Sequence, residues 1–103
     1  MERMEKLKEF LKTNPADSFV QHALALEYVK AGDDTTARKL FEELLHREPG
    51  YVGSYYHFAK LLERNNARDE AIKWYEIGME QAKKAGEMHA FGELRSAYEE
   101  LTF

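Results

Sequence analysis

Residues 24–41 read LALEYVKAGDDTTARKLF, and residues 58–75 read FAKLLERNNARDEAIKWY. The two stretches align without a gap at an offset of 34 residues. The matched pairs are Leu24 and Phe58, Ala25 and Ala59, Tyr28 and Leu62, Ala37 and Ala71, and Phe41 and Tyr75. A fixed period of this length is typical of a repeat array, whose units bury their apolar faces by stacking. The sequence therefore predicts a surface built by stacking rather than an enclosed catalytic cavity.

Six helices and no strands are expected along the chain. Apolar residues recur at helical spacing over residues 2–13, 18–31, 33–47, 52–64, 68–84 and 87–101. The first of these segments carries Met4, Leu7, Phe10 and Leu11 on one face. The residues that end or separate the helices are Pro15, Gly32, Pro49, Asn66 and Gly86. Because the connections are short, consecutive helices should form antiparallel hairpins in an all-α array.

Two helix starts carry capping signals. Ser18 followed by Gln21 has the spacing of a capping box, in which the two side chains satisfy free backbone amides. Asp33 or Asp34 can cap the helix that follows.

The composition limits the classes of function. Of 103 residues, 44% are hydrophobic and 33% charged, which is ordinary for one globular domain. The chain has no cysteine, so disulfides and thiolate metal sites are excluded. Its formal charge is -4 with basic and acidic residues interspersed, which disfavours a nucleic-acid partner. No apolar run predicts a signal peptide or a membrane span, so we expect a cytoplasmic protein without a membrane partner.

The residues at the 34-residue period resemble the tetratricopeptide repeat, a helix pair with small and aromatic residues at fixed positions. The first full repeat, residues 18–51, supplies Gln21, Leu24, Ala25, Tyr28, Ala37, Phe41, Leu44 and Pro49. The second, residues 52–85, supplies Tyr55, Phe58, Ala59, Leu62, Ala71, Tyr75, Gly78 and Lys83. Residues 1–15 resemble the second half of a preceding unit, and residues 86–103 are expected to form a capping helix. The resemblance thus implies a single domain over residues 1–103.

The chain departs from the family pattern at several positions. Gln21 stands where the family has tryptophan, and Lys83 stands where it has proline. In the last segment Leu94 follows Phe58 by 36 residues rather than 34. Arg95 then occupies the position of the two matched alanines, which is acceptable if no further helix packs there.

The resemblance also implies a function. In this family the first helix of each pair lines a concave groove that binds peptides. The candidate groove residues here are Phe19, His22, Leu26, Tyr56 and Lys60. Tyr56 would supply aromatic contact area, and Lys60 could pair with an acidic ligand group. For Phe19 and Leu26 the alternative is packing between adjacent helices.

One known use of the groove is not expected. Some members grip the C-terminal carboxylates of chaperones with lysine, asparagine and arginine side chains. The matching positions are His22 and Leu26 in the first repeat and Lys60 in the second, of which only the lysine fits. The last helix offers Ala90 and Glu93, or in the slipped register Gly92 and Ser96. We therefore predict no tight binding of acidic chaperone tails.

No catalytic or metal-binding set stands out. The histidines are His22, His46, His57 and His89, and no two are three or four residues apart, the spacing by which one helix presents two metal ligands. We expect no enzyme, no cofactor and no metal, but a module that binds a protein or peptide partner. The alternative is a structural module that self-associates as a homodimer, because short arrays usually need about three repeats for stability.

Overall fold

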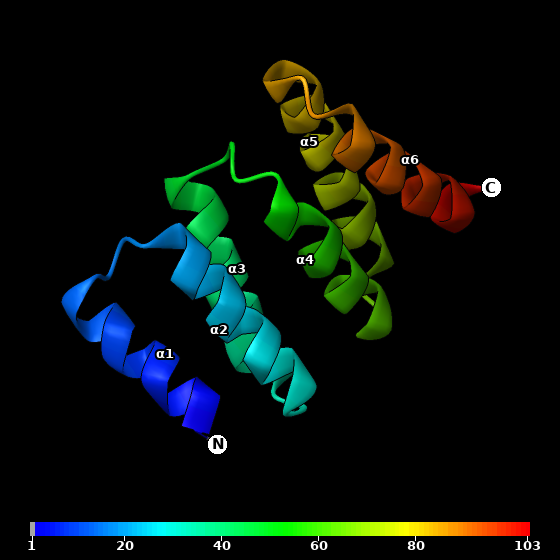
Figure 1. Cartoon of the computed structure of the whole chain (residues 1–103). Helices are drawn as coiled ribbons and strands as arrows, with labels where there is room; N and C mark the ends of the chain where they lie inside the picture. The colour runs from blue at the N-terminus through cyan, green and yellow to red at the C-terminus, as the bar shows by residue number, and fades with distance from the viewer. Residues whose placement is uncertain (1) are drawn as a thin grey trace. The chain divides into compact units, whose positions relative to one another are not determined.

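The computed structural model describes residues 2–103, and these are all-α with six helices and no strands. The helices are α1 (Glu2–Thr13), α2 (Ser18–Lys30), α3 (Asp34–Arg47), α4 (Gly53–Arg64), α5 (Arg68–Ala85) and α6 (Met88–Thr102). They fall into two compact units, Met1–Glu48 with α1 to α3 and Pro49–Phe103 with α4 to α6 (Figure 1). The predicted fold class is confirmed, and each predicted helix lies within one residue of its observed bounds.

The turns between helices use the left-handed backbone region where the sequence predicts it. Gly32 after α2 has φ 83°, and Asn66 after α4 has φ 62°. Gly86 after α5 has φ 72°. Glycine adopts this region without steric strain, and asparagine tolerates it better than most residues do. Gly32 and Asn66 are 34 residues apart, so both full repeats turn at the same position.

The start of α2 differs from the prediction. Asp17, not Ser18, is the N-cap, and its carboxylate accepts a hydrogen bond of 3.0 Å from the backbone N–H of Val20. The Ser18 hydroxyl instead donates to the Glu48 carboxylate at 2.6 Å. The Gln21 side chain donates to the Leu40 carbonyl of α3, so the predicted capping box does not form. Aspartate at the N-cap satisfies the same free amide.

The two repeats begin their second helices differently. Asp33 caps α3 by accepting a hydrogen bond of 3.1 Å from the backbone N–H of Thr36. The residue 34 positions later is Ala67, which begins α5 with similar backbone angles but offers no side-chain hydrogen bond. The helices α4 and α6 also begin without a side-chain cap. Of the helices α2 to α6, only α2 and α3 therefore begin with a side-chain cap, and both belong to the first unit.

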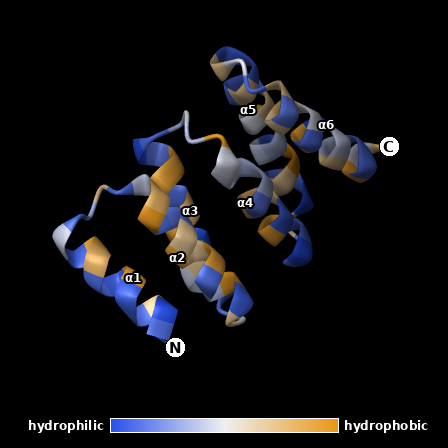
Figure 2. Cartoon of the chain, viewed as in Figure 1, coloured by the Kyte–Doolittle hydropathy of each residue, from blue (hydrophilic) through white to orange (hydrophobic). Residues whose placement is uncertain are grey.

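The core of the first unit lies between α2 and α3, with α1 packed against α2. Ala25 and Ala37 are fully buried, as the repeat pattern predicts for helices in close approach. Phe41 and Leu44 are also fully buried. Phe10 of α1 is 46% exposed, whereas Met4 of the same apolar pattern is buried. Figure 2 shows polar and apolar bands alternating along the helices, as expected when one side of each helix is buried.

The core of the second unit is built from aromatic residues around a glycine. Tyr55, Phe58 and Tyr75 are buried between α4 and α5. A Cβ atom added at Gly78 would lie 2.7 Å from the Cβ of Tyr55. Trp74 is half-buried, and its ring centroid lies 5.1 Å from that of Phe58. The close approach of α5 to α4 therefore requires the absence of a side chain at Gly78.

Candidate partner-binding groove

The candidate residues of the first unit lie on one side of α2. Phe19 is 71% exposed, which is unusual for a phenylalanine and excludes the packing alternative for this residue. His22 is half-buried, with its ring edge-to-face against the buried Phe41 at 6.1 Å between centroids. Leu26, one turn further on, is half-buried. The α2 face thus combines an exposed aromatic side chain, that of Phe19, with the half-buried side chains of His22 and Leu26.

The candidate residues of the second unit, Tyr56 and Lys60, lie one turn apart on α4, and both are half-buried. The Lys60 Nζ atom lies 5.8 Å from the centroid of the Tyr56 ring. It also lies 3.7 Å from the Glu63 carboxylate. Lys60 is therefore already paired within the chain through a carboxylate and an aromatic face.

The Glu63 carboxylate is held by a second partner, because the buried Tyr75 hydroxyl donates a hydrogen bond to it. Burial raises the pKa of Tyr75 well above its usual value, and the hydrogen bond to Glu63 raises it further. Tyr75 therefore stays protonated and remains a donor. The hydrogen bond from Tyr75 thus orients the Glu63 carboxylate, and the ion pair with Glu63 keeps Lys60 beside the Tyr56 ring.

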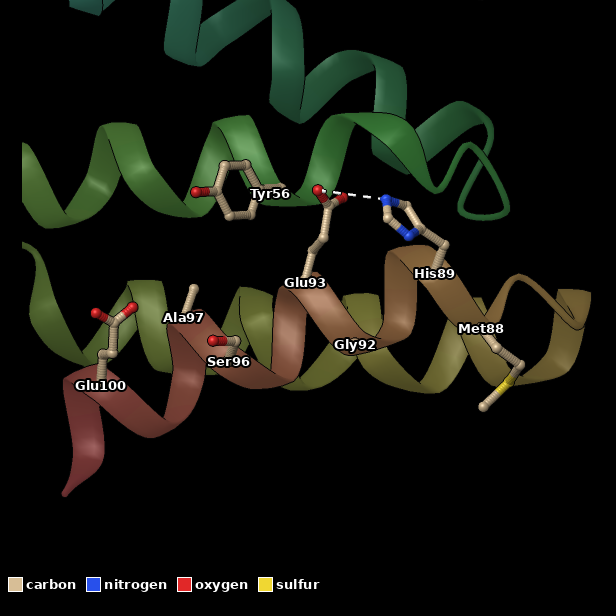
Figure 3. A pocket seen from close by; sticks show the side chains of 8 residues that line it. All are labelled: Tyr56, Met88, His89, Gly92, Glu93, Ser96, Ala97 and Glu100. Atoms are coloured by element: carbon tan, nitrogen blue, oxygen red, sulfur yellow. Dashed lines mark ion pairs between the residues drawn. The ribbon is translucent and has the colours of Figure 1, made fainter.

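A groove of about 500 Å³ lies between α4 and α6 in the second unit. The residues that line it are Tyr56, Met88, His89, Gly92, Glu93, Ser96, Ala97 and Glu100. In Figure 3, Glu93 and His89 reach from α6 toward α4 beside Tyr56, whereas Met88 points away. A smaller hollow of about 200 Å³ shares Tyr56 and Glu93 and adds Val52, Gly53, His57, Ala90 and Leu94.

The charge of this groove comes from carboxylates. Glu93 and Glu100 are exposed, and the lining contains no lysine and no arginine. The His89 Nε2 atom lies 3.7 Å from the Glu93 carboxylate. Burial lowers the pKa of His57, although the nearby Glu93 opposes this effect.

The α6 lining is the part that the sequence analysis assigned to a capping helix. The slipped register does place Gly92 and Ser96 at the groove positions of this helix, and both line the groove. Leu94, whose offset of 36 revealed the slip, is 1% exposed in the core. Arg95 is exposed and pairs with Glu99 on its own helix at 3.0 Å. The signal for α6 as a groove wall was thus the register of Leu94.

Two further observations concern metals and membranes. Among residues 2–103, no group of three or more histidine, aspartate or glutamate side chains is placed to hold a metal ion. None of the six helices combines the length and the apolar character that a membrane span requires.

The sequence profile of the tetratricopeptide repeat matches residues 28–94. The chain belongs to the tetratricopeptide repeat family. This match covers most of the two full repeats and the start of α6. The family is in general one of protein–protein interaction modules without catalytic activity.

Solved structures agree with this assignment. A tetratricopeptide repeat domain protein from Salinibacter ruber is 41% identical, and its solution structure aligns over 84% of this chain and 88% of that one with a TM-score of 0.81. The crystal structure of the Salinibacter protein gives a TM-score of 0.80. A protein from Bordetella parapertussis, 20% identical, shares the fold over 96% of this chain and 86% of its own, with a TM-score of 0.82.

One curated relative is a much larger enzyme. Mouse aspartyl/asparaginyl beta-hydroxylase is 27% identical over 74 residues, which is 72% of this chain. The chain spans 10% of the length of that relative. The likeness is therefore to one part of the mouse protein.

Proposed function

We propose that this chain binds a segment of a partner protein, without catalysis, through the first helices of its repeats. The candidate surface in the second unit is the α4–α6 groove with Tyr56 and Lys60. The candidate surface in the first unit is the α2 face with Phe19, His22 and Leu26. In this role the chain is an adaptor or scaffold of the cytoplasm, with no nucleic acid or cofactor needed for binding.

The α4–α6 groove is the observation that carries this proposal. Its volume of about 500 Å³ lies within the range of known ligand sites. Tyr56 forms the α4 wall, and Gly92 and Ser96 leave space along α6. An added Cβ at Gly92 would meet no atom within 4 Å, so a peptide backbone has room to approach this helix. Tyrosine is one of the residue types that most often dominate the binding energy of an interface.

A peptide library displayed on phage can test this groove without a known partner. Peptides selected on the wild-type chain would be measured by fluorescence anisotropy against Tyr56→Ala and Tyr98→Ala. Tyr98 is a matched control, because it is also half-buried and lies outside the groove lining. We expect Tyr56→Ala to weaken binding by tenfold or more, and Tyr98→Ala to leave it unchanged. Selected peptides that bind both variants equally would contradict the proposal.

The α2 face needs its own pair of variants. Phe19→Ala removes the most exposed of the candidate residues, and Phe10→Ala removes another exposed phenylalanine of the same unit. If the α2 face takes part in binding, the selected peptides should lose affinity for Phe19→Ala alone. Equal affinity for both variants would show that Phe19 and the α2 face are not part of the binding site.

A second candidate function is self-association. It is supported by exposed apolar side chains, namely those of Phe10 (46%), Met88 (59%) and Phe103 (95%). Size-exclusion chromatography with light scattering would show a dimer that dissociates on dilution. A monomer at all micromolar concentrations would exclude this function for the isolated chain.

We also propose that residues 1–103 act as one domain, with a half repeat at 1–15, full repeats at 18–51 and 52–85, and a capping helix at 86–103. The 34-residue period supports the two full repeats. Cooperative unfolding of both compact units in one transition would support the single domain.

A further inference from the structure

The charges of the α4–α6 groove bear on the chemistry of its ligand, and this inference rests on the proposed function of that groove. Glu93 and Glu100 both lie in the lining. Seven residues, or two helical turns, separate them, so their Cα atoms are about 10.5 Å apart along α6. Figure 3 shows both carboxylates on the side of α6 that lines the groove.

These two carboxylates have little compensation. Glu100 makes no ion pair or hydrogen bond with another residue in the described range 2–103. The Glu93 side chain is 59% exposed, and its ion-pair partner is the His89 imidazole. Lys60 is the candidate cation on α4, but its charge is balanced by Glu63 at 3.7 Å. The groove therefore keeps an excess of negative charge at neutral pH.

The remaining lining suits a cation on a long side chain. The Tyr56 ring, whose centroid lies 5.8 Å from the Lys60 Nζ atom, stands beside Glu93 in Figure 3, so a guanidinium group at that carboxylate would contact the side of the ring away from Lys60. Gly92 and Ser96 are small, and they lie along the same face of α6 as the two carboxylates. A peptide in the extended polyproline II conformation has three residues per turn and advances about 3.1 Å per residue, so side chains three positions apart point the same way about 9 Å apart, which is near the spacing of the two glutamates.

We propose that the α4–α6 groove binds an extended basic segment of a partner protein, with arginine or lysine side chains at Glu93 and Glu100 and against the ring of Tyr56. The preferred segment carries two basic residues three positions apart. Acidic segments and nucleic-acid phosphates are repelled by the same carboxylates.

Fluorescence anisotropy with two synthetic peptides tests this proposal. One labelled peptide carries two arginines three positions apart in a neutral background, and the other carries glutamates at those positions. The proteins are wild type, the double variant Glu93→Gln with Glu100→Gln, and a control double variant Glu43→Gln with Glu80→Gln. The control removes the same charge from exposed carboxylates of α3 and α5 that lie outside the groove lining. Thermal unfolding followed by circular dichroism verifies that all three proteins are folded.

We expect the arginine peptide to bind wild type and the control with equal affinity, and the groove variant roughly tenfold more weakly, as for two exposed charge pairs. Binding should weaken with added salt, and the glutamate peptide should not bind. Equal affinity for all three proteins, an equal loss in the control, no binding of the arginine peptide, or tighter binding of the glutamate peptide would each overturn the proposal.

The outcome is separable from that of the proposed function. If phage selection yields neutral peptides whose binding depends on Tyr56, while the arginine peptide fails, the groove is a peptide site and only its basic preference is wrong. If no selected peptide binds in a way that depends on Tyr56, the proposed function of the groove is itself wrong.

Discussion

The glycines of α5 and α6 allow one packing contact to be tested by a pair of identical substitutions. Gly78 and Gly92 both lie inside helices, so replacing either with alanine gains about 1 kcal/mol of helix propensity. Their surroundings differ. A Cβ at Gly92 would meet no atom within 4 Å, whereas a Cβ at Gly78 would lie 2.7 Å from the Cβ and 2.9 Å from the Cγ of Tyr55.

A methyl group at Gly78 is costly because neither it nor the Tyr55 Cβ atom can move without its helix backbone. Carbon atoms pack best at about 3.5–4.0 Å, and the Tyr55 Cβ is bonded directly to the backbone of α4. Relief requires α4 and α5 to separate, so we take the upper part of the usual overpacking cost, about 3 kcal/mol. Subtracting the propensity gain leaves a net loss of about 2 kcal/mol for Gly78→Ala. Gly92→Ala should instead gain about 1 kcal/mol.

Thermal unfolding followed by circular dichroism measures both effects. For a chain of this size, each kcal/mol shifts Tm by about 4–8 °C. Gly78→Ala should therefore lower Tm by roughly 10 °C, and Gly92→Ala should raise it by roughly 5 °C. If Gly78→Ala melts at or above the wild-type temperature while Gly92→Ala also melts higher, α4 and α5 are not in the close contact described, and the reasoning fails.

Four further predictions concern stability and binding. The pKa of Tyr55 is raised by burial from 10.0 to about 12, so the unfolded state releases this proton first, and Tyr55 should contribute roughly 2 kcal/mol to a fall in the free energy of unfolding between pH 10 and 12, to which the buried Tyr75 adds its own contribution. Urea titrations at several pH values measure this fall, and Tyr55→Phe should reduce it; an unchanged slope in that variant would contradict the assignment. The Gln21 Oε1 atom is buried without a hydrogen-bond partner among residues 2–103, so Gln21→Met should keep or raise stability. A loss above about 1 kcal/mol in urea would show that the amide hydrogen bond to Leu40 dominates. Trp74 is the single tryptophan and reports on the second unit, so its fluorescence and the circular dichroism of the whole chain should give the same urea midpoint if residues 1–103 are one domain. Acidic peptides that reproduce chaperone C-termini should show no micromolar binding by fluorescence titration, and saturable binding in that range would contradict the absence of a carboxylate clamp.

The fold could be predicted because it depends on residue types at fixed spacing. The 34-residue period identified Ala25, Ala37, Ala59 and Ala71 as positions of close helix approach, and all four are fully buried. The turn positions could also be predicted, because glycine and asparagine adopt left-handed backbone conformations more readily than other residues do.

The details of the site depend on side chains from helices that are distant in sequence. The pairing of Lys60 with Glu63 could have been expected from their spacing along α4. The hydrogen bond from Tyr75 of α5 to that carboxylate could not, since it depends on the packing of two helices. The α6 wall at Gly92 and Ser96 followed from the slipped register, and Glu93 was offered by the other register, but Glu100 was not among the candidates although it lines the same groove. Candidate residues Phe19, His22, Leu26, Tyr56 and Lys60 remain predictions as binding residues.

The unequal helix starts of the two repeats bear on how the protein can evolve. Ala67 begins α5 where Asp33 begins α3, with φ −99° and ψ 60° against φ −101° and ψ 75°. An aspartate at position 67 could make the missing cap, which is worth about 1 kcal/mol. Position 67 is outside the groove lining, so this reserve of stability can be gained without altering recognition. A lineage that acquired it could tolerate destabilising changes among the groove residues, and so explore new partners, while keeping the fold.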